Sequence, residues 1–120
     1  MAYKFRIIRR KSGERAVQFL YNSTIIVWSE NYKSRATALN CIASLQKNAP
    51  EAPVVDLTHG EEGKGYRFEI ALSRNKQYFA RFVARNGETM VRSETYPSRA
   101  NAKKAIASVK KNGPVAQLAD

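Results

Sequence analysis

Few residues of this chain have the types and spacing that an active site requires. The one histidine, His59, lies in a glycine-rich stretch, where a solvated loop residue is the simplest interpretation. The one cysteine, Cys41, stands among apolar residues at helical spacing, which favours a buried thiol over a reactive one. The sequence contains no Cys and His pair with metal-ligand spacing, no glycine loop that matches a nucleotide cradle and no Ser/His/Asp set. We therefore predict no enzyme activity, no catalytic residue, no cofactor and no metal.

Two carboxylates, Glu30 and Glu94, occupy equivalent places in two similar segments, and paired acids can carry out acid–base chemistry. An arginine follows each of them closely, Arg35 in the first segment and Arg99 in the second. An arginine near the start of a helix lies at the positive end of the helix dipole, which is unfavourable. The more natural role of each glutamate is therefore to form an ion pair that offsets this arginine charge. The sequence favours two structural ion pairs over a catalytic pair.

The pattern Ser-Glu-x-Tyr-x-Ser-Arg surrounds these acids and is the one polar cluster that occurs twice. Each copy could form a ligand pocket at a strand-to-helix turn. Alternatively, the second serine caps the helix, the tyrosine packs under the turn and the glutamate satisfies backbone donors. The folding role is favoured, because a duplicated unit repeats whatever its fold requires. The residues of this shared turn are Ser29, Glu30, Tyr32, Ser34, Ser93, Glu94, Tyr96 and Ser98.

The shared turn belongs to a longer internal repeat. Residues 29–36 match residues 93–100, and the match continues downstream at the same offset. Upstream, residues 3–7 correspond to residues 66–70 with an offset shorter by one, which a one-residue difference in a hairpin turn explains. We predict a single domain over residues 1–120 that consists of a first unit (1–57), a flexible glycine-rich linker (58–65) and a second unit (66–120).

Both units show the same change of hydrophobic period. Alternation of period two in residues 3–7 and 66–70 predicts half-buried strands. Apolar residues at i, i+3, i+4 and i+7, counted from Ala38 and again from Ala102, predict one amphipathic helix per unit. Each unit therefore reads β-β-β-α-β. The remaining predicted strands cover residues 16–21, 25–28 and 54–57 in the first unit and residues 78–85, 89–92 and 115–118 in the second.

Turn and cap residues support this order. Ser34 and Ser98 are suited to cap the two helices. Asn48 and the Asn112–Gly113 pair, each followed by a proline, favour a left-handed stop at the helix ends. Asn86–Gly87 is typical of a type I′ hairpin turn, in which both residues have positive φ.

The repeated stretch resembles the YegP-like family of small proteins, once in each unit. The first unit departs from the pattern at Ser23 and Thr24 and at Leu45–Gln46. The resemblance implies an α+β fold of two tandem β(3)-α-β repeats that share one antiparallel sheet, with exchanged C-terminal strands and two helices packed on one face. It also implies that single-unit relatives pair as homodimers. The clearest carriers of the resemblance are Asn86, Gly87, Glu88, Ser93, Glu94, Tyr96, Ser98, Ile106, Ser108, Val109, Lys110 and Asn112.

The composition of the 120 residues narrows the class of protein. Hydrophobic residues make up 43% of the chain, too many for a charge-dominated disordered protein, and one cysteine excludes a disulfide scaffold. The longest apolar run, Ile25–Trp28, is too short for a membrane helix, and residues 1–6 lack the apolar core of a secretory signal. We predict a cytoplasmic protein that does not bind membranes and is a monomer with internal pseudo-twofold symmetry.

The net charge of +11 is the remaining functional signal. Residues 1–57 carry nine Lys and Arg against four Asp and Glu, and residues 58–120 carry twelve against six, so the excess is spread evenly. One basic face is predicted on the second helix and another on the sheet face turned away from the helices. An ordinary solvated surface explains either basic face about as well as a phosphate-binding surface does. The residues are Lys4, Arg6, Trp28, Arg67, Arg81 and Arg92 on the sheet and Arg99, Lys103 and Lys110 on the helix.

Two functions remain open from the sequence. The first is a basic, non-enzymatic module that binds an anionic partner such as nucleic acid, with little sequence readout. The second is a protein-interaction or structural domain that uses the open sheet face. A small-ligand binder at the two shared turns is a distant third.

Overall fold

Each unit of the chain folds as three strands, a helix and a short last strand, as the hydrophobic periods predict. The computed structural model describes residues 3–119. The first unit contains β1 (Tyr3–Arg9), β2 (Arg15–Tyr21), β3 (Thr24–Trp28), α1 (Arg35–Asn48) and β4 (Val54–Asp56). The second contains β5 (Arg67–Leu72), β6 (Tyr78–Val83), β7 (Thr89–Ser93), α2 (Arg99–Asn112) and β8 (Gln117–Leu118). Short 3₁₀ turns follow both helices and β4, namely η1 (Ala49–Glu51), η3 (Gly113–Val115) and η2 (Leu57–His59).

All eight strands form one sheet in the order β4-β5-β6-β7-β3-β2-β1-β8. The last strand of each unit pairs with the first strand of the other unit: β4 pairs with β5, and β8 pairs with β1. The predicted α+β fold with exchanged C-terminal strands is therefore confirmed. The two exchanged strands are parallel to their partners, while the six central strands are antiparallel, so the shared sheet is mixed rather than wholly antiparallel.

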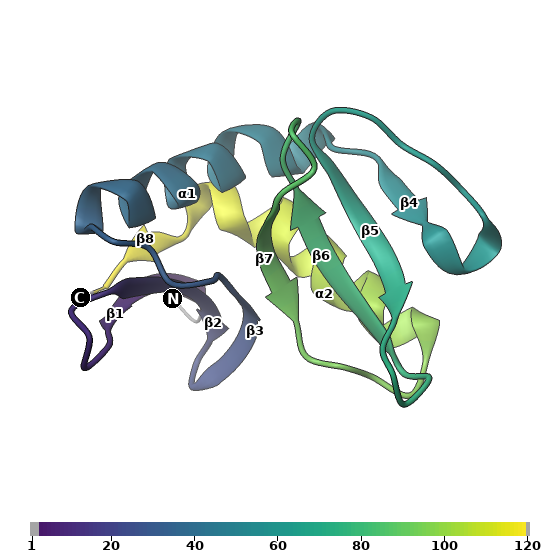
Figure 1. Ribbon diagram of the computed structural model, residues 1–120, viewed down its shortest axis with the longest axis horizontal. Coiled ribbons are helices and arrows are strands. Elements are labelled where there is room, and N and C mark those ends of the chain that lie inside the picture. Colours follow the sequence, from purple (N-terminus) through teal and green to yellow (C-terminus); the bar gives the residue numbers. More distant parts are fainter. Residues whose placement is uncertain (1–2, 120) are drawn as a thin grey trace.

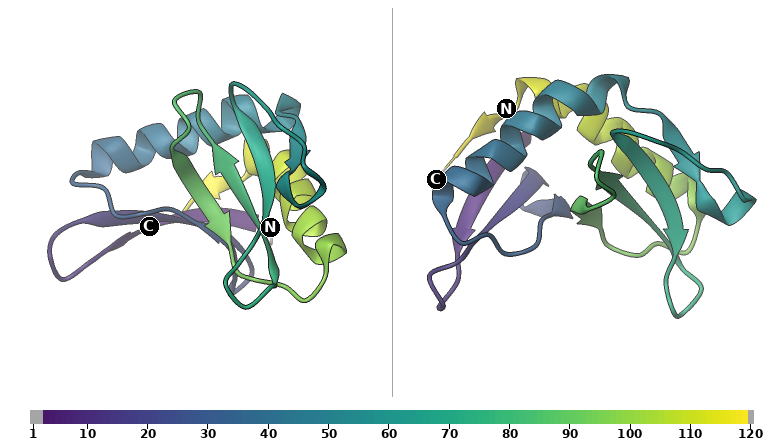
Figure 2. Two further views of the ribbon diagram at one scale, coloured as in Figure 1. Left: turned by 45° about the vertical axis from the view of Figure 1, so that its right-hand side comes forward. Right: turned by 45° about the horizontal axis from the view of Figure 1, so that its top comes forward.

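Both helices pack on the same side of this sheet. In Figure 1, α2 passes behind β5, β6 and β7, and α1 covers the first unit. The apolar stripes predicted from Ala38 and Ala102 are buried. In the second view of Figure 2, the two sets of strands diverge below the helices like the limbs of an arch. The largest fully buried side chains of the core beneath the helices are Phe5, Phe19, Phe68 and Phe82.

Three local predictions differ from the structure. The helix ends are right-handed, since φ is −64° at Ala49 and −56° at Gly113, and the chain continues into η1 and η3 with proline near their start. For the same reason β8 is shorter than predicted. In the second hairpin, Gly87 has φ of 87° while Asn86 has negative φ, so the turn is not type I′.

The predicted linker is held against the second unit. A Cβ at Gly63 would lie 2.6 Å from Val55 Cγ2 and 2.9 Å from Arg67 Cδ. Arg67 Nη1 also donates to the carbonyl of Gly65 at 2.9 Å. Within residues 3–119, no helix combines the length and apolar character needed to cross a membrane.

Candidate functional site

Six side chains from six strands form a line across the sheet face opposite the helices. The strand register places them side by side, and their neighbours Phe5, Phe19 and Phe82 point into the core. Because side chains alternate along a strand, the line must lie on the open face. We call it the open-face row, and its members in order are Arg6, Gln18, Trp28, Arg92, Arg81 and Glu69.

Lys4 and Arg67 lie on the same face, two residues before Arg6 and Glu69. The structure thus brings together all six sheet residues that the sequence singled out. The alternation of side chains also places on this face an apolar layer that is buried but separate from the main core. Arginine stems can cover such a layer while the charged groups remain in solvent. The layer consists of Ala16, Leu20, Val55, Ala71 and Val83.

Arg92 occupies the middle of the open-face row, where the two units meet. Its guanidinium carbon lies 4.3 Å from the ring centre of Phe79 and 5.7 Å from that of Trp28. Arg81 lies 5.9 Å from the same Phe79 ring. The sequence prediction missed Phe79, although it stands two residues before Arg81 and period two places both on one face. The centre of the row therefore combines guanidinium groups with two aromatic rings.

Glu69 is the one acid of the open-face row, and it is 6% exposed. Its two carboxylate oxygens accept from Arg67 Nε and Arg81 Nε, each at 2.8 Å. Burial alone would raise the pKa of Glu69, but the hydrogen bonds and charges of Arg81 and Arg67 outweigh burial and hold it below its ordinary value. Glu69 therefore stays ionised and offsets charge from these two arginines.

The opposite end of the row has no such acid. Arg6 donates to Gln18 Oε1 through Nε at 3.1 Å and through Nη2 at 2.6 Å. Because the partner is neutral, the charge of Arg6 is oriented but not cancelled. Positive charge on the open face is therefore concentrated on the first unit and at Arg92.

The three basic residues predicted on the second helix lie on the other side of the molecule. Arg99 Nε lies 2.8 Å from Asp56 Oδ2, and its guanidinium carbon is 4.9 Å from the Tyr78 ring centre. The carboxylate partner of Arg99 is thus Asp56 and not Glu94, which corrects the prediction. Lys110 Nζ donates to the carbonyl of Ala52 at 2.8 Å. Arg99 and Lys110 hold the exchanged segment in place, whereas Lys103 is exposed.

Asp56 is buried at the end of β4. Burial alone would raise its pKa, but hydrogen bonds from Thr58 and the charges of His59 and Arg99 outweigh burial and hold the pKa below its ordinary value. Thr58 donates through both its backbone N–H and its hydroxyl. His59 Nδ1 lies 3.4 Å from Asp56 Oδ2, although the imidazole remains 55% exposed. The histidine thus lies at the exposed end of η2, close to one buried carboxylate.

The first serine of the shared turn bridges two strands in both units. Ser29 Oγ accepts from Val17 N at 2.8 Å and donates to Glu30 O at 2.8 Å. Ser93 Oγ accepts from Ala80 N at 2.9 Å and donates to Glu94 O at 2.8 Å. We call each set of contacts a serine clamp. A hydroxyl is the smallest group that can both accept and donate at such a buried position.

The tyrosines and second serines of the turn also serve the fold. The backbones of Tyr32 and Arg15 exchange two hydrogen bonds, as do those of Tyr96 and Tyr78. Ser34 and Ser98 accept from first-turn N–H groups and cap α1 and α2, as predicted. Glu30 and Glu94 are exposed, and neither side chain accepts a backbone hydrogen bond within residues 3–119. These contacts favour the folding role of the turn, except for the predicted role of its glutamate.

A hollow of about 330 Å³ lies beside the first shared turn and reaches the hairpin of the second unit. Tyr32 and Cys41 are among its lining residues. Burial raises the pKa of both groups, and Cys41 is 4% exposed. The thiol is therefore a poor nucleophile, as the sequence predicts. Among residues 3–119, no three His, Cys, Asp and Glu side chains are grouped closely enough to hold a metal ion.

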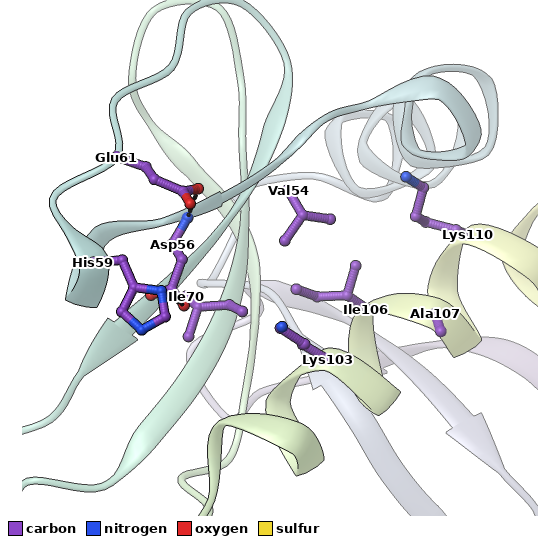
Figure 3. Close-up of a pocket in the computed structure, with 9 residues that line it drawn as sticks. All are labelled: Val54, Asp56, His59, Glu61, Ile70, Lys103, Ile106, Ala107 and Lys110. Carbon is purple, nitrogen blue, oxygen red and sulfur yellow. Dashed lines mark hydrogen bonds and ion pairs between the residues drawn. The ribbon is translucent and has the colours of Figure 1, made fainter.

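Sequence reasoning missed a second hollow, which lies beside α2 and is shown in Figure 3. It combines residues from β4, η2, β5 and α2, which are far apart in the sequence. One local signal was available, because Lys103 on α2 corresponds to Leu39 on α1 in the repeat.

Several curated proteins resemble this chain. A UPF0339 protein of Caulobacter vibrioides is 50% identical over 58 residues, which are 48% of this chain and 98% of that protein. Its length corresponds to a single unit. A UPF0339 protein of Pseudomonas aeruginosa is 32% identical over 125 aligned positions, covering 100% of this chain and 98% of that protein. UPF0339 protein YegP of Yersinia pestis is 39% identical over 92 residues, covering 77% of this chain and 70% of that protein.

Solved structures share the fold. The solution structure of yegP from E. coli, a protein of unknown function, has a TM-score of 0.79 and 25% identity, covering 100% of this chain and 93% of that one. UPF0339 protein SO3888 from Shewanella oneidensis gives the same TM-score at 22% identity, covering 100% of this chain and 92% of that one. The family described as "Domain of unknown function (DUF1508)" matches residues 19–56 and 73–120, one segment in each unit. The resemblance read from the repeated motif is confirmed, and the chain belongs to this uncharacterised YegP-like, DUF1508 family.

Proposed function

We propose that the chain is a non-enzymatic module that binds nucleic acid without sequence preference through its open sheet face. The observation that carries the proposal is the open-face row, in which Arg92 stands against Trp28 and Phe79 at the centre of the sheet. Open sheets that combine basic and aromatic side chains suit single strands, because phosphates bind the cations and bases stack on planar groups.

The charges on this face determine how the binding would work. Lys4, Arg6 and Arg92 have no carboxylate partner within residues 3–119, whereas Arg67 and Arg81 share Glu69. We expect these three cations to make most of the phosphate contacts. Counterion release for single strands gives a slope of about −0.7 per contact in log K against log salt, so three contacts predict about −2.

The test is fluorescence anisotropy with random single-stranded and double-stranded oligonucleotides at low and physiological salt. We expect single strands to bind more tightly than duplexes, because an unpaired base can stack on the aromatic centre of the row. The absence of binding at low salt would overturn the proposal. A preference for duplex would argue against stacking as its basis.

A protein partner with an acidic surface is the second candidate. The exposed parts of Trp28 and Phe79, next to several arginines, have the composition of many binding hot spots. The anisotropy titration separates the two candidate functions. Affinity for single-stranded oligonucleotides supports nucleic-acid binding, because a surface that binds only proteins does not require such affinity.

A further inference from the structure

A pocket of about 360 Å³ lies on the helix side of the sheet, between α2 and the segment that follows β4. Figure 3 shows its apolar floor, formed by Val54, Ile70 and Ile106. Ile70 and Ile106 are buried, while Val54 is 40% exposed. The volume falls in the range of small-molecule sites, roughly 300–1,000 Å³. Because the open-face row is on the other side of the sheet, this pocket is a separate feature.

One wall of the pocket offers acceptors. Glu61 Oε1 accepts from Asp56 N at 2.8 Å, and its second carboxylate oxygen has no partner among residues 3–119. Asp56 is already balanced by Arg99. His59 Nδ1 lies beside Asp56 Oδ2, so this carboxylate is already in contact with two basic side chains and Glu61 is the open acceptor of the wall. This wall can therefore receive a cationic N–H group.

The opposite wall is basic and belongs to α2, where Lys103 and Lys110 flank the floor (Figure 3). Lys110 donates to Ala52 O, and in the first unit Gln46 donates to Ala116 O at 3.1 Å from the equivalent position. That contact is thus part of the repeated fold.

Lys103 differs from Lys110 in this respect. It has no hydrogen bond or ion pair among residues 3–119, and the equivalent residue of α1 is Leu39. The fold therefore does not require a cation at this place, and the ammonium group is available to a ligand.

We propose that this pocket binds a small zwitterion with a branched aliphatic side chain, such as an α-amino acid of the leucine type. The ammonium group of the ligand faces Glu61, its carboxylate faces Lys103 and Lys110, and its aliphatic part covers the floor. Opposite charges on opposite walls complement a zwitterion better than a simple anion or cation. The proposal is independent of nucleic-acid binding.

The test is an NMR titration of the full chain with L-leucine. Two half-ligands are compared at equal ionic strength, namely 4-methylpentanoate, which lacks the ammonium group, and 3-methylbutylamine, which lacks the carboxylate. We expect saturable shifts of the Ile70 and Ile106 methyl groups and a Kd at least about tenfold lower for leucine than for either half-ligand. No saturable shift with leucine, shifts elsewhere only, or a half-ligand of equal affinity would overturn the proposal.

Matched variants locate the charged contacts. Lys103→Met and Glu61→Gln should each weaken leucine binding by roughly tenfold, the size of one charged hydrogen bond. Lys104→Met is the control, since Lys104 is an exposed neighbour that does not line the pocket. Lys103→Arg should retain most of the affinity. Equal effects of Lys103→Met and Lys104→Met would show that only net charge matters and would contradict the assigned site.

Discussion

At the scale of single residues, one pair of equivalent positions in the two units carries opposite charges. Arg6 of the first unit corresponds to Glu69 of the second, and both point to the open face. Arg6 binds a neutral amide, whereas Glu69 binds two arginines. In the proposed binding mode, Glu69 therefore reduces the charge that Arg67 and Arg81 offer to phosphates.

Removal of this acid gives the first prediction. We expect Glu69→Gln to increase affinity for single-stranded oligonucleotides by several-fold and to steepen the salt slope by roughly one, because Arg67 and Arg81 are released. Urea unfolding should show a cost of about 1–2 kcal/mol from the lost charged hydrogen bonds. Unchanged affinity in a folded Glu69→Gln variant would show that the second unit does not contact the ligand.

The two buried carboxylates also predict how stability depends on pH. The pKa values of Glu69 and Asp56 are lower in the folded chain than the ordinary values of about 4.3 and 3.9. Their contribution to stability is therefore complete above about pH 5 and is lost as the pH falls through the folded pKa values. We expect the free energy of unfolding to decrease towards acid, with a shallower decrease in Glu69→Gln and in Asp56→Asn. Urea denaturation at a series of pH values measures this. An equal decrease in the free energy of unfolding in the wild-type chain and in both variants would refute the prediction.

At the scale of elements, the sequence predicted the strands, the helices and the serine caps of the helices. It did not predict the contacts that hold the strand ends or the conformation of the helix C-termini. Period two and the i, i+3, i+4, i+7 spacing depend on local burial, so they can be read from the sequence. The serine clamps could not, because Ser29 and Ser93 bind strand residues twelve or more positions away. The prediction of a left-handed stop at Gly113 was wrong, because the chain continues from α2 into η3 with right-handed geometry and with proline near its start.

The serine clamps give a prediction that both units should share. Ser29→Ala and Ser93→Ala should each destabilise the fold by about 1–3 kcal/mol, because a buried N–H loses its acceptor. Ser12→Ala, at an exposed turn, should change stability by less than about 0.5 kcal/mol. Urea denaturation measures all three. A small effect of both buried substitutions would mean that the clamp is replaceable by water.

At the scale of the whole molecule, the two units share a fold but not a surface. Contacts that hold the fold recur in both, as with Ser29 and Ser93, or Gln46 and Lys110. Groups that face solvent differ, as with Leu39 and Lys103. The sequence could therefore predict the fold from its repetition. It could not predict the pocket beside α2, because this pocket depends on how individual side chains of β4, η2, β5 and α2 meet. The positive charge is likewise not confined to one face, since Arg92 stands in the open-face row and Lys103 lies on α2.

The central claim is that the open sheet face, rather than net charge alone, binds nucleic acid. The most direct measurement compares the affinities of Arg92→Gln and Lys104→Gln for one single-stranded oligonucleotide by anisotropy at low salt. Both variants lose one positive charge, but Arg92 stands in the open-face row and Lys104 lies on α2. We expect Arg92→Gln to weaken binding by roughly tenfold or more and Lys104→Gln by less than about twofold. Equal losses in the two variants, or no binding by the wild-type chain, would contradict the claim.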